Sequence, residues 1–191
     1  MLQKLVKMNR SYRRFHQEVR ITQEVLNELV DLARLCPSAS NRQPLKYMVV
    51  SDPKKCAEVF PCLVWAGYLT DWPGPIEGER PSAYIIILSD PALNSKPDKD
   101  VGIAAQTILL GAVEKGYGGC LVGSIKKDQL QQVLNIPQDL EVQLVAALGK
   151  PKETVRIESV GSDGDIKYWR DEKEVHHVPK RKLEDILIGE F

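Results

Sequence analysis

The feature that most constrains the fold is an unbroken apolar run at residues 83–90, AYIIILSD, with prolines close to both of its ends. A strand that is apolar on both faces is typical of the middle of a covered sheet. Residues 100–119, DVGIAAQTILLGAVEKGYGG, are apolar around almost the whole circumference of a helix. Such a helix belongs inside a protein or at a large interface. The sequence therefore predicts a buried central strand and a long buried central helix.

Shorter elements complete the prediction of an α+β fold. Apolar residues from Leu26 to Ala33 repeat at helical spacing, after an N-cap at Thr22 and before Pro37. Further elements are expected as strands at 47–51, 120–125 and 141–151, and as a helix that Asp128 caps and that runs to Leu134. The strands and helices do not alternate regularly, so we expect a central mixed or antiparallel sheet of four to five strands flanked by helices. Residues 1–191 are expected to form one domain, in which about 165–191 make an extended arm ending in one helical turn.

Composition excludes several classes of protein. The chain has 26 basic and 26 acidic residues, which argues against a nucleic-acid binder or a polybasic membrane anchor. No apolar run approaches the roughly 20 residues of a membrane span, and the first residues lack the apolar stretch of a signal peptide. We therefore expect a cytoplasmic protein. The four cysteines form no CxxC pair, so they are expected to be small buried residues and not zinc ligands.

Protein-borne catalytic motifs are not found. The sequence has no HExxH, GxSxG or Walker A motif, and GYGGCLVG does not match the dinucleotide fingerprint GxGxxG. His176 and His177 are adjacent, so on a strand they would point to opposite faces. The motif search therefore identifies no catalytic histidine, cysteine or carboxylate.

Two basic clusters suggest an anionic ligand. The segment NRSYRRF brings Arg10, Ser11, Arg13 and Arg14 together, and KRK places Lys180, Arg181 and Lys182 near the other end of the chain. Guanidinium groups and a serine hydroxyl suit a phosphate, and chain termini often lie close together. The alternative is that both clusters are solvated, with the arginines paired to Glu18 or Glu24.

Two loops are further candidates. PSASNRQP carries Ser38, Asn41 and Gln43, whose short polar groups suit the edge of a planar ring, although an ordinary turn would also use them. The stretch WAGYLTDWPGPIEGERP carries Trp65, Tyr68 and Trp72 and is expected to be a surface loop or lid. Its aromatic groups either stack on a ligand or simply pack the lid.

Four stretches in this order resemble motifs of the nitroreductase family of FMN-dependent oxidoreductases. They are NRSYRRF, PSASNRQPLKYMVV, the segment from residue 100 to 123, and HHVPKRKLEDIL. The resemblance implies a nitroreductase-like fold and FMN held noncovalently at the interface of a homodimer. The C-terminal arm would then reach the partner subunit.

The resemblance also implies which residues bind the flavin. The implied contacts are Arg10, Ser11, Arg13, Pro37, Ser38, Ala39, Asn41, Gln43, Leu121, Val122, Gly123, Lys180 and Arg181, with Trp65, Tyr68 and Trp72 as substrate or lid residues. Asn9 replaces the first arginine of the family motif. The region FPCLVWAGYL lacks the Asn and Lys that many members use against the flavin. The positive charge near the flavin N1 and O2 would then come mainly from Arg13.

The implied reaction is ping-pong hydride transfer from NADH or NADPH to nitroaromatic, quinone or similar electron-poor acceptors, with no protein group as catalyst and no metal. Three alternatives stay open. One is a flavin dimer with another reaction, such as reductive dehalogenation or enoate reduction, and another is a non-enzymatic flavin-binding or sensing module. The last is a structural domain with solvated basic clusters.

Overall fold

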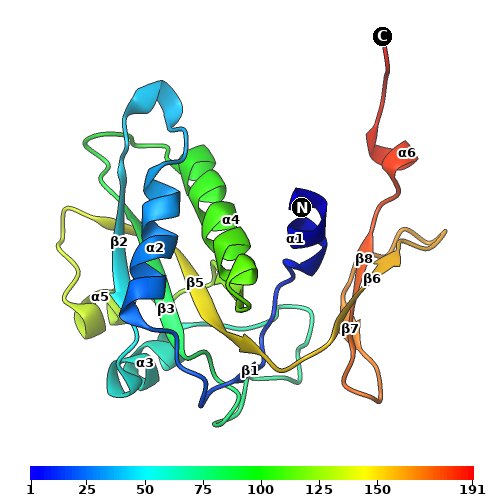
Figure 1. Ribbon diagram of the computed structural model, residues 1–191, viewed down its shortest axis with the longest axis horizontal. Helices are drawn as coiled ribbons and strands as arrows, with labels where there is room; N and C mark the ends of the chain where they lie inside the picture. The colour runs from blue at the N-terminus through cyan, green and yellow to red at the C-terminus, as the bar shows by residue number, and fades with distance from the viewer.

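The computed structural model describes residues 1–191 and shows an α+β fold built on a five-stranded sheet (Figure 1). The strand order is β1-β5-β3-β2. Strand β4 pairs with the same edge of β5 as β1 does, and all of these pairs are antiparallel. The strands are β1 (Phe15–His16), β2 (Leu45–Val50), β3 (Ala83–Ser89), β4 (Gly118–Val122) and β5 (Glu141–Pro151). The apolar run at 83–90 is the central strand β3, as predicted, and all seven of its residues are buried.

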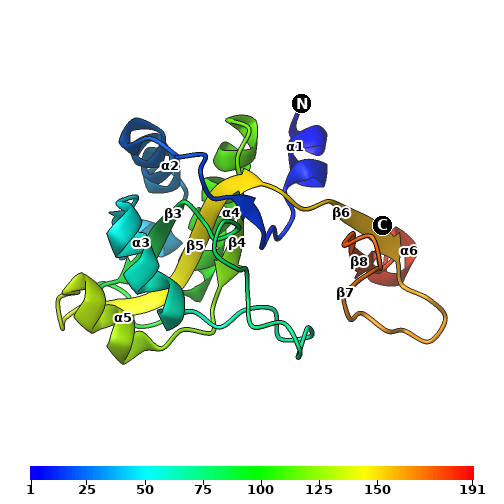
Figure 2. The same cartoon turned by 90° about the horizontal axis from the view of Figure 1, so that it is seen from below.

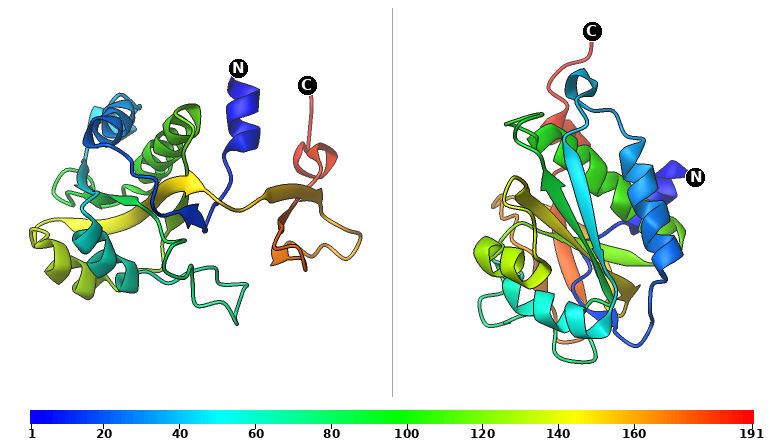
Figure 3. Two further views of the ribbon diagram at one scale, coloured as in Figure 1. Left: turned by 60° about the horizontal axis from the view of Figure 1, so that its bottom comes forward. Right: turned by 90° about the vertical axis from the view of Figure 1, so that its left-hand side faces the viewer.

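Helices cover both faces of this sheet (Figure 3). One face carries α2 (Gln23–Arg34) and α4 (Asp98–Glu114), and the other carries α3 (Pro53–Val59), the short turn η2 (Phe60–Cys62) and α5 (Lys127–Leu134). Ile85 and Ile87 of β3 pack on the α2–α4 side, while Ile86 packs on the α3–α5 side. The alternation of side chains along one strand therefore feeds two separate cores.

The long helix α4 is buried on one side only. Its Ala105, Ile108 and Ala112 are fully buried, whereas Ile103 is 42% exposed. Within this chain, the all-round apolar helix of the sequence thus keeps one side uncovered.

The C-terminal residues form a small second sheet beside the main body (Figure 2). Its strands are β6 (Val155–Ser159), β7 (Trp169–Arg170) and β8 (His176–Lys180), and the single turn α6 (Leu183–Ile186) follows, as expected for the end of the arm. The sheet begins at Val155, earlier than the arm expected from about residue 165. Apolar side chains of the last residues are exposed, among them Leu183 at 69% and Ile188 at 100%.

Several local details differ from expectation. A helix that the sequence did not indicate, α1 (Leu2–Met8), precedes the arginine cluster and buries none of its residues. Asp128 lies inside the first turn of α5 and is not its cap, which is Lys126. Thr22 caps α2 as predicted, because its side chain accepts a hydrogen bond from the Val25 N–H. No helix in the chain has both the length and the apolar composition needed to cross a bilayer.

The cysteines match the expectation in most respects. All four are free thiols; Cys56, Cys62 and Cys120 are buried, and Cys36 is half-buried.

Candidate functional site

The arginine segment lies along strand β4, close to residues 121–123. Ser11 bridges to Gly119, and the Tyr12 N–H donates to the Gly119 carbonyl over 3.0 Å. Gly119 leaves no room for a side chain, because an added Cβ would lie 2.8 Å from the Ala147 carbonyl oxygen of β5. The result is that Arg13 shares a cavity of about 170 Å³ with a set of residues from three other segments: Val64, Trp65, Ala66, Gly67, Cys120, Leu121, Val122, Gly123, Ser124 and Tyr168.

Arg13 is buried without a carboxylate partner. Its Nη1 donates to the Ser11 carbonyl over 3.3 Å and to Nε2 of His176 over 3.1 Å, and its guanidinium lies 4.7 Å from the centre of the Tyr168 ring. Arg13 is 9% exposed and takes part in none of the ion pairs of the chain. A buried cation that lacks a counter-ion is unusual and favours a site for an anion.

His176 is held neutral beside this guanidinium. Burial, followed by the charges of Arg13 and Arg170, lowers the pKa of His176 to about 4. Since a guanidinium can only donate, Nε2 accepts and the ring proton sits on Nδ1, which is buried and has no partner. As the strand geometry predicted, His177 points to the other face, where it contacts Glu158 and Asp171.

Arg14 is used differently from its neighbour. Its guanidinium bonds both oxygens of Glu79, at 2.5 and 2.9 Å, and also reaches Glu174 at 2.6 Å. With Lys152 as a second partner, Arg14 lowers the pKa of Glu79 to about 2. The expected pairing with Glu18 or Glu24 is therefore wrong for Arg14. The ion pairs of this arginine stabilise the fold.

Glu153 is a residue of this region that the sequence did not indicate. Its side chain is 1% exposed, and its carboxylate accepts hydrogen bonds from the backbone N–H groups of Arg13 and Arg14 and from the Arg170 side chain. No local pattern marks it, because its partners lie far away in the sequence.

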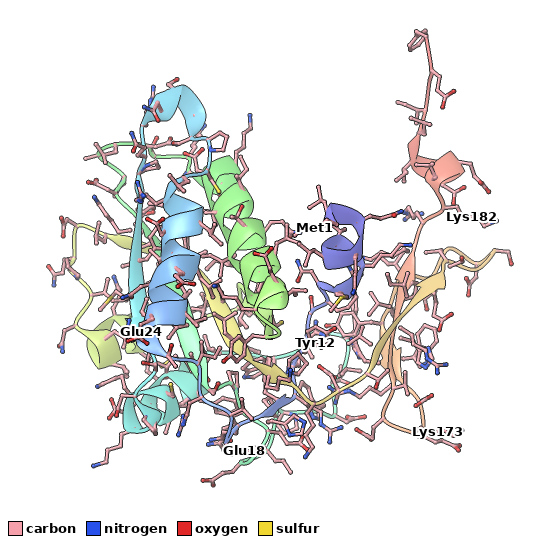
Figure 4. The ribbon with its side chains drawn as sticks, in the orientation of Figure 1. Met1, Tyr12, Glu18, Glu24, Lys173 and Lys182 are labelled. Atoms are coloured by element: carbon pink, nitrogen blue, oxygen red, sulfur yellow. The ribbon has the colours of Figure 1, made fainter.

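The two basic clusters lie on neighbouring segments but do not touch. Arg13 contacts His176 at the start of β8, and Lys180 lies at its other end, four residues or about 13 Å further along. Lys180 and Arg181 are exposed and form no ion pair. Figure 4 shows Lys182 beyond the end of β8, at the height of Met1 and well above Tyr12. Arg10 donates from Nη2 to the Val6 carbonyl over 2.8 Å, and its buried Nε has no partner.

The loop at 37–43 lies at the opposite end of α4. Ser38 Oγ and the Ala39 N–H donate to Asp100 in the first turn of that helix, over 3.1 and 2.9 Å. This loop contains η1 (Ala39–Asn41), and Ser40, Asn41 and Gln43 all have positive φ. Since α4 has 17 residues and Gly119 follows its far end, the loop lies on the order of 25 Å from Arg13 in the same chain. Pro37, Ala39, Asn41 and Gln43 are exposed.

The three aromatic residues of the lid have different surroundings. Trp65 is 7% exposed and stacks on Phe60 at 5.8 Å, so it belongs to the core as well as to the cavity wall. The ring of Tyr68 packs against that of Tyr168, with 5.0 Å between the ring centres, and the Arg170 guanidinium lies 4.3 Å from the centre of the Trp72 ring. The loop therefore reaches across to the C-terminal sheet.

Comparison with known proteins identifies the family. The model of the nitroreductase family matches residues 6–66 and 77–150, which is most of the chain. The chain belongs to the nitroreductase family. The match includes the Arg13 segment, the 37–43 loop and strands β2 to β5. It leaves out residues 67–76 and 151–191, in which Tyr68, Trp72 and Glu153 lie.

Individual relatives in the family agree with this. A protein of Archaeoglobus fulgidus with the provisional name NADH dehydrogenase/NAD(P)H nitroreductase is 28% identical over 158 residues, which are 78% of this chain and 85% of that protein. The structure of a nitroreductase family protein from Streptococcus pneumoniae has a TM-score of 0.68 at 17% identity, covering 82% of this chain and 93% of that one. The structure of an FMN-dependent nitroreductase from Clostridium difficile has a TM-score of 0.67 at 24% identity, covering 88% of this chain and 97% of that one. The nitroreductase-like α+β fold is thus confirmed.

The residues around Arg13 fit one part of a flavin mononucleotide. The site offers unpaired N–H donors, and a Cβ added at the exposed Gly123 would meet only a Leu144 methyl group at 3.7 Å, so the backbone there is open to a flat ring. A cavity of about 170 Å³ is nevertheless smaller than the roughly 300–1,000 Å³ of typical ligand pockets. The cavity within this chain is therefore small for a ligand of this kind.

Proposed function

We propose that this chain is an FMN-dependent oxidoreductase that uses NADH or NADPH to reduce nitroaromatic, quinone or similar electron-poor acceptors, and that it acts as a homodimer. The observation that carries the proposal is the buried Arg13 guanidinium, which has no carboxylate partner and lines a cavity beside Leu121 and Gly123. The names of two relatives, one FMN-dependent and one linked to NAD(P)H, support the choice of cofactors.

The residues of the chain would bind and orient the cofactor. FMN, when bound, would supply hydride transfer between the nicotinamide and the acceptor. Arg13 would provide the positive charge near the N1 and O2 edge of the ring, and residues 121–123 would face the ring with their backbone. Arg10, Ser11, Lys180 and Arg181 would hold the phosphate, which carries close to two negative charges. Since reductant and acceptor would use the same open face in turn, ping-pong kinetics are expected.

A second copy would complete the site. The loop at 37–43 lies too far from Arg13 to serve the same flavin from one chain, and its outer residues are exposed. We propose that each flavin takes Arg13 and residues 121–123 from one subunit and the 37–43 loop from the other. The uncovered side of α4 and the exposed apolar C-terminal residues would lie in that interface.

The cofactor and the reaction are tested together. The purified protein is mixed with FMN and freed of excess flavin, and its absorbance spectrum is recorded before and after NADH or NADPH is added without oxygen. We expect a bound-flavin spectrum that bleaches with one of the nucleotides and returns when a nitroaromatic or a quinone is added. A protein that retains no flavin, or a flavin that neither nucleotide reduces, would contradict the proposal.

The shared site is tested by mixing two inactive variants. Arg13→Met damages one half of the site, and Asn41→Ala combined with Gln43→Ala damages the other half. If each flavin takes both halves from different subunits, random re-association of the two variants restores about one quarter of the native sites. No recovery of flavin binding, despite exchange of subunits, would rule out this arrangement.

A further inference from the structure

Glu153 connects three parts of the molecule through one buried carboxylate. It follows the end of β5, and its Oε1 accepts from the backbone N–H groups of Arg13 and of Arg14, the latter over 3.2 Å. Its Oε2 accepts from Arg170 Nη2 over 3.1 Å. Successive backbone N–H groups that converge on one anionic oxygen form a strong, directional anchor.

These contacts fix the backbone from which the Arg13 side chain extends. On one side, Ser11 and Tyr12 hold this segment to Gly119 of β4. On the other side, Glu153 holds residues 13 and 14, and the Lys152 N–H donates to the Arg14 carbonyl over 2.9 Å. The guanidinium of Arg13 then reaches His176, which lies on the same small sheet as Arg170. Backbone and side chain of Arg13 are therefore held by neighbouring groups.

We infer that Glu153 is the positioning residue that aims Arg13 into the cavity and ties the C-terminal sheet to it. The inference rests on the proposed function, because there Arg13 is the cation that faces the flavin. Through Arg170, which lies over Trp72 at 4.3 Å, the same carboxylate also links the aromatic loop to the site. Glu153, Arg170 and Trp72 all lie in the parts of the chain that the family model does not match.

A neighbouring carboxylate provides the matched control. Glu79 is also buried, with its side chain 9% exposed, and it also forms ion pairs. Its carboxylate meets only the side chains of Arg14 and Lys152 and does not contact the backbone of Arg13. Glu79→Gln therefore removes a charge of the same kind next to the site without releasing the Arg13 backbone.

The experiment measures FMN affinity by fluorescence titration and amide hydrogen exchange of residues 11–16 in flavin-free protein, for the wild type and for E153A, E153Q and E79Q. For E153A we expect FMN binding to weaken about tenfold or more, by analogy with the loss of a residue that orients a metal ligand. The amides of Arg13 and Arg14 should lose protection. E153Q keeps one carbonyl oxygen for these amides and should restore most of the affinity. E79Q should lower thermal stability and leave FMN affinity and the two amides unchanged.

Two results would overturn the inference: folded E153A that binds FMN like the wild type, or Arg13 and Arg14 amides as protected in E153A as in the wild type. If E153A does not fold, E153D decides the matter, because its shorter side chain cannot reach both the amides and Arg170; wild-type affinity and protection in E153D would refute the role. A wild-type protein that binds no FMN would end the proposed function. The exchange of the flavin-free variants would still show whether Glu153 fixes the Arg13 segment.

Discussion

Replacing Arg13 with methionine should weaken FMN binding strongly and change the stability of the flavin-free protein much less. Methionine keeps most of the length of the side chain and removes its charge. The variant loses the hydrogen bonds to Ser11 and His176 and the contact with the Tyr168 ring, which together contribute roughly 3–7 kcal/mol. It also removes a buried charge that has no counter-ion. Burying that charge costs the folded wild-type protein several kcal/mol, so its removal favours folding. The two effects oppose each other, so the free energy of unfolding should change by no more than about 1–2 kcal/mol.

The effect on binding has no such compensation. A hydrogen bond from a charged group contributes about 1.5–3 kcal/mol, so the dissociation constant for FMN should rise by about one to two orders of magnitude. The pKa of His176 should rise from about 4, because the second-largest cause of its depression is the Arg13 charge. Burial, the largest cause, should still keep it below the ordinary value of 6.5.

The assays are urea denaturation of flavin-free protein, fluorescence titration with FMN and an NMR titration of the His176 ring. Arg14→Met is the matched control, since Arg14 is ion-paired to Glu79 and Glu174. We expect this control to lose stability and to keep its FMN affinity. FMN binding by Arg13→Met that equals the wild type, or a loss of stability well above 2 kcal/mol, would refute the reasoning.

Three further predictions concern the fold. The His177 ring lies 2.8 Å from the Glu158 carboxylate and 3.3 Å from that of Asp171. The hydrogen bond to Glu158 raises the pKa of His177 most, followed by the bond to Asp171. The stabilisation of the small sheet by this histidine should therefore be complete below the pKa of His177 in the unfolded chain, and it should fade as the pH rises through the higher pKa of the folded protein. Amide exchange of β8 against pH measures this, and an unchanged pH dependence in His177→Gln would count against it. Ile86→Ala should lower the free energy of unfolding by about 2–5 kcal/mol in urea denaturation, because the side chain of this β3 residue is 0% exposed under its covering helices. A loss below about 1 kcal/mol would mean that the core collapses fully around the smaller side chain. Gly119→Ala should cost about 1–3 kcal/mol, because its Cβ would lie 2.8 Å from a backbone carbonyl oxygen of β5, and wild-type stability would show that β4 can shift.

The sequence predicted the parts of the fold that local patterns encode. The unbroken apolar run of β3 and the Thr22 cap of α2 follow from the periodicity and chemistry of neighbouring residues. The opposite faces of His176 and His177 follow from strand geometry alone. Helix α1 escaped prediction because it has only seven residues and buries none of them, although Leu2, Leu5 and Val6 are spaced as on one face of a helix.

The site was harder to predict because its contacts join distant parts of the chain. Arg13 and Arg14 are adjacent arginines, yet only Arg14 finds a carboxylate, Glu79, which is 65 residues away. Glu153 lies 140 residues from Arg13, and no spacing rule connects them. The segment NRSYRRF could therefore suggest an anion site, and only the resemblance to the family separated Arg13 from Arg14. The ion pair that ties Arg14 to Glu79 is visible in the structure alone.

The most direct test of the central claim is a single chromatographic run of the FMN-loaded protein, with light scattering for mass and absorbance for flavin. We expect a particle of twice the 21.5 kDa chain mass that carries one flavin per chain. Flavin retained by a particle of single-chain mass, or a dimer that carries none, would contradict a site built by two subunits around Arg13.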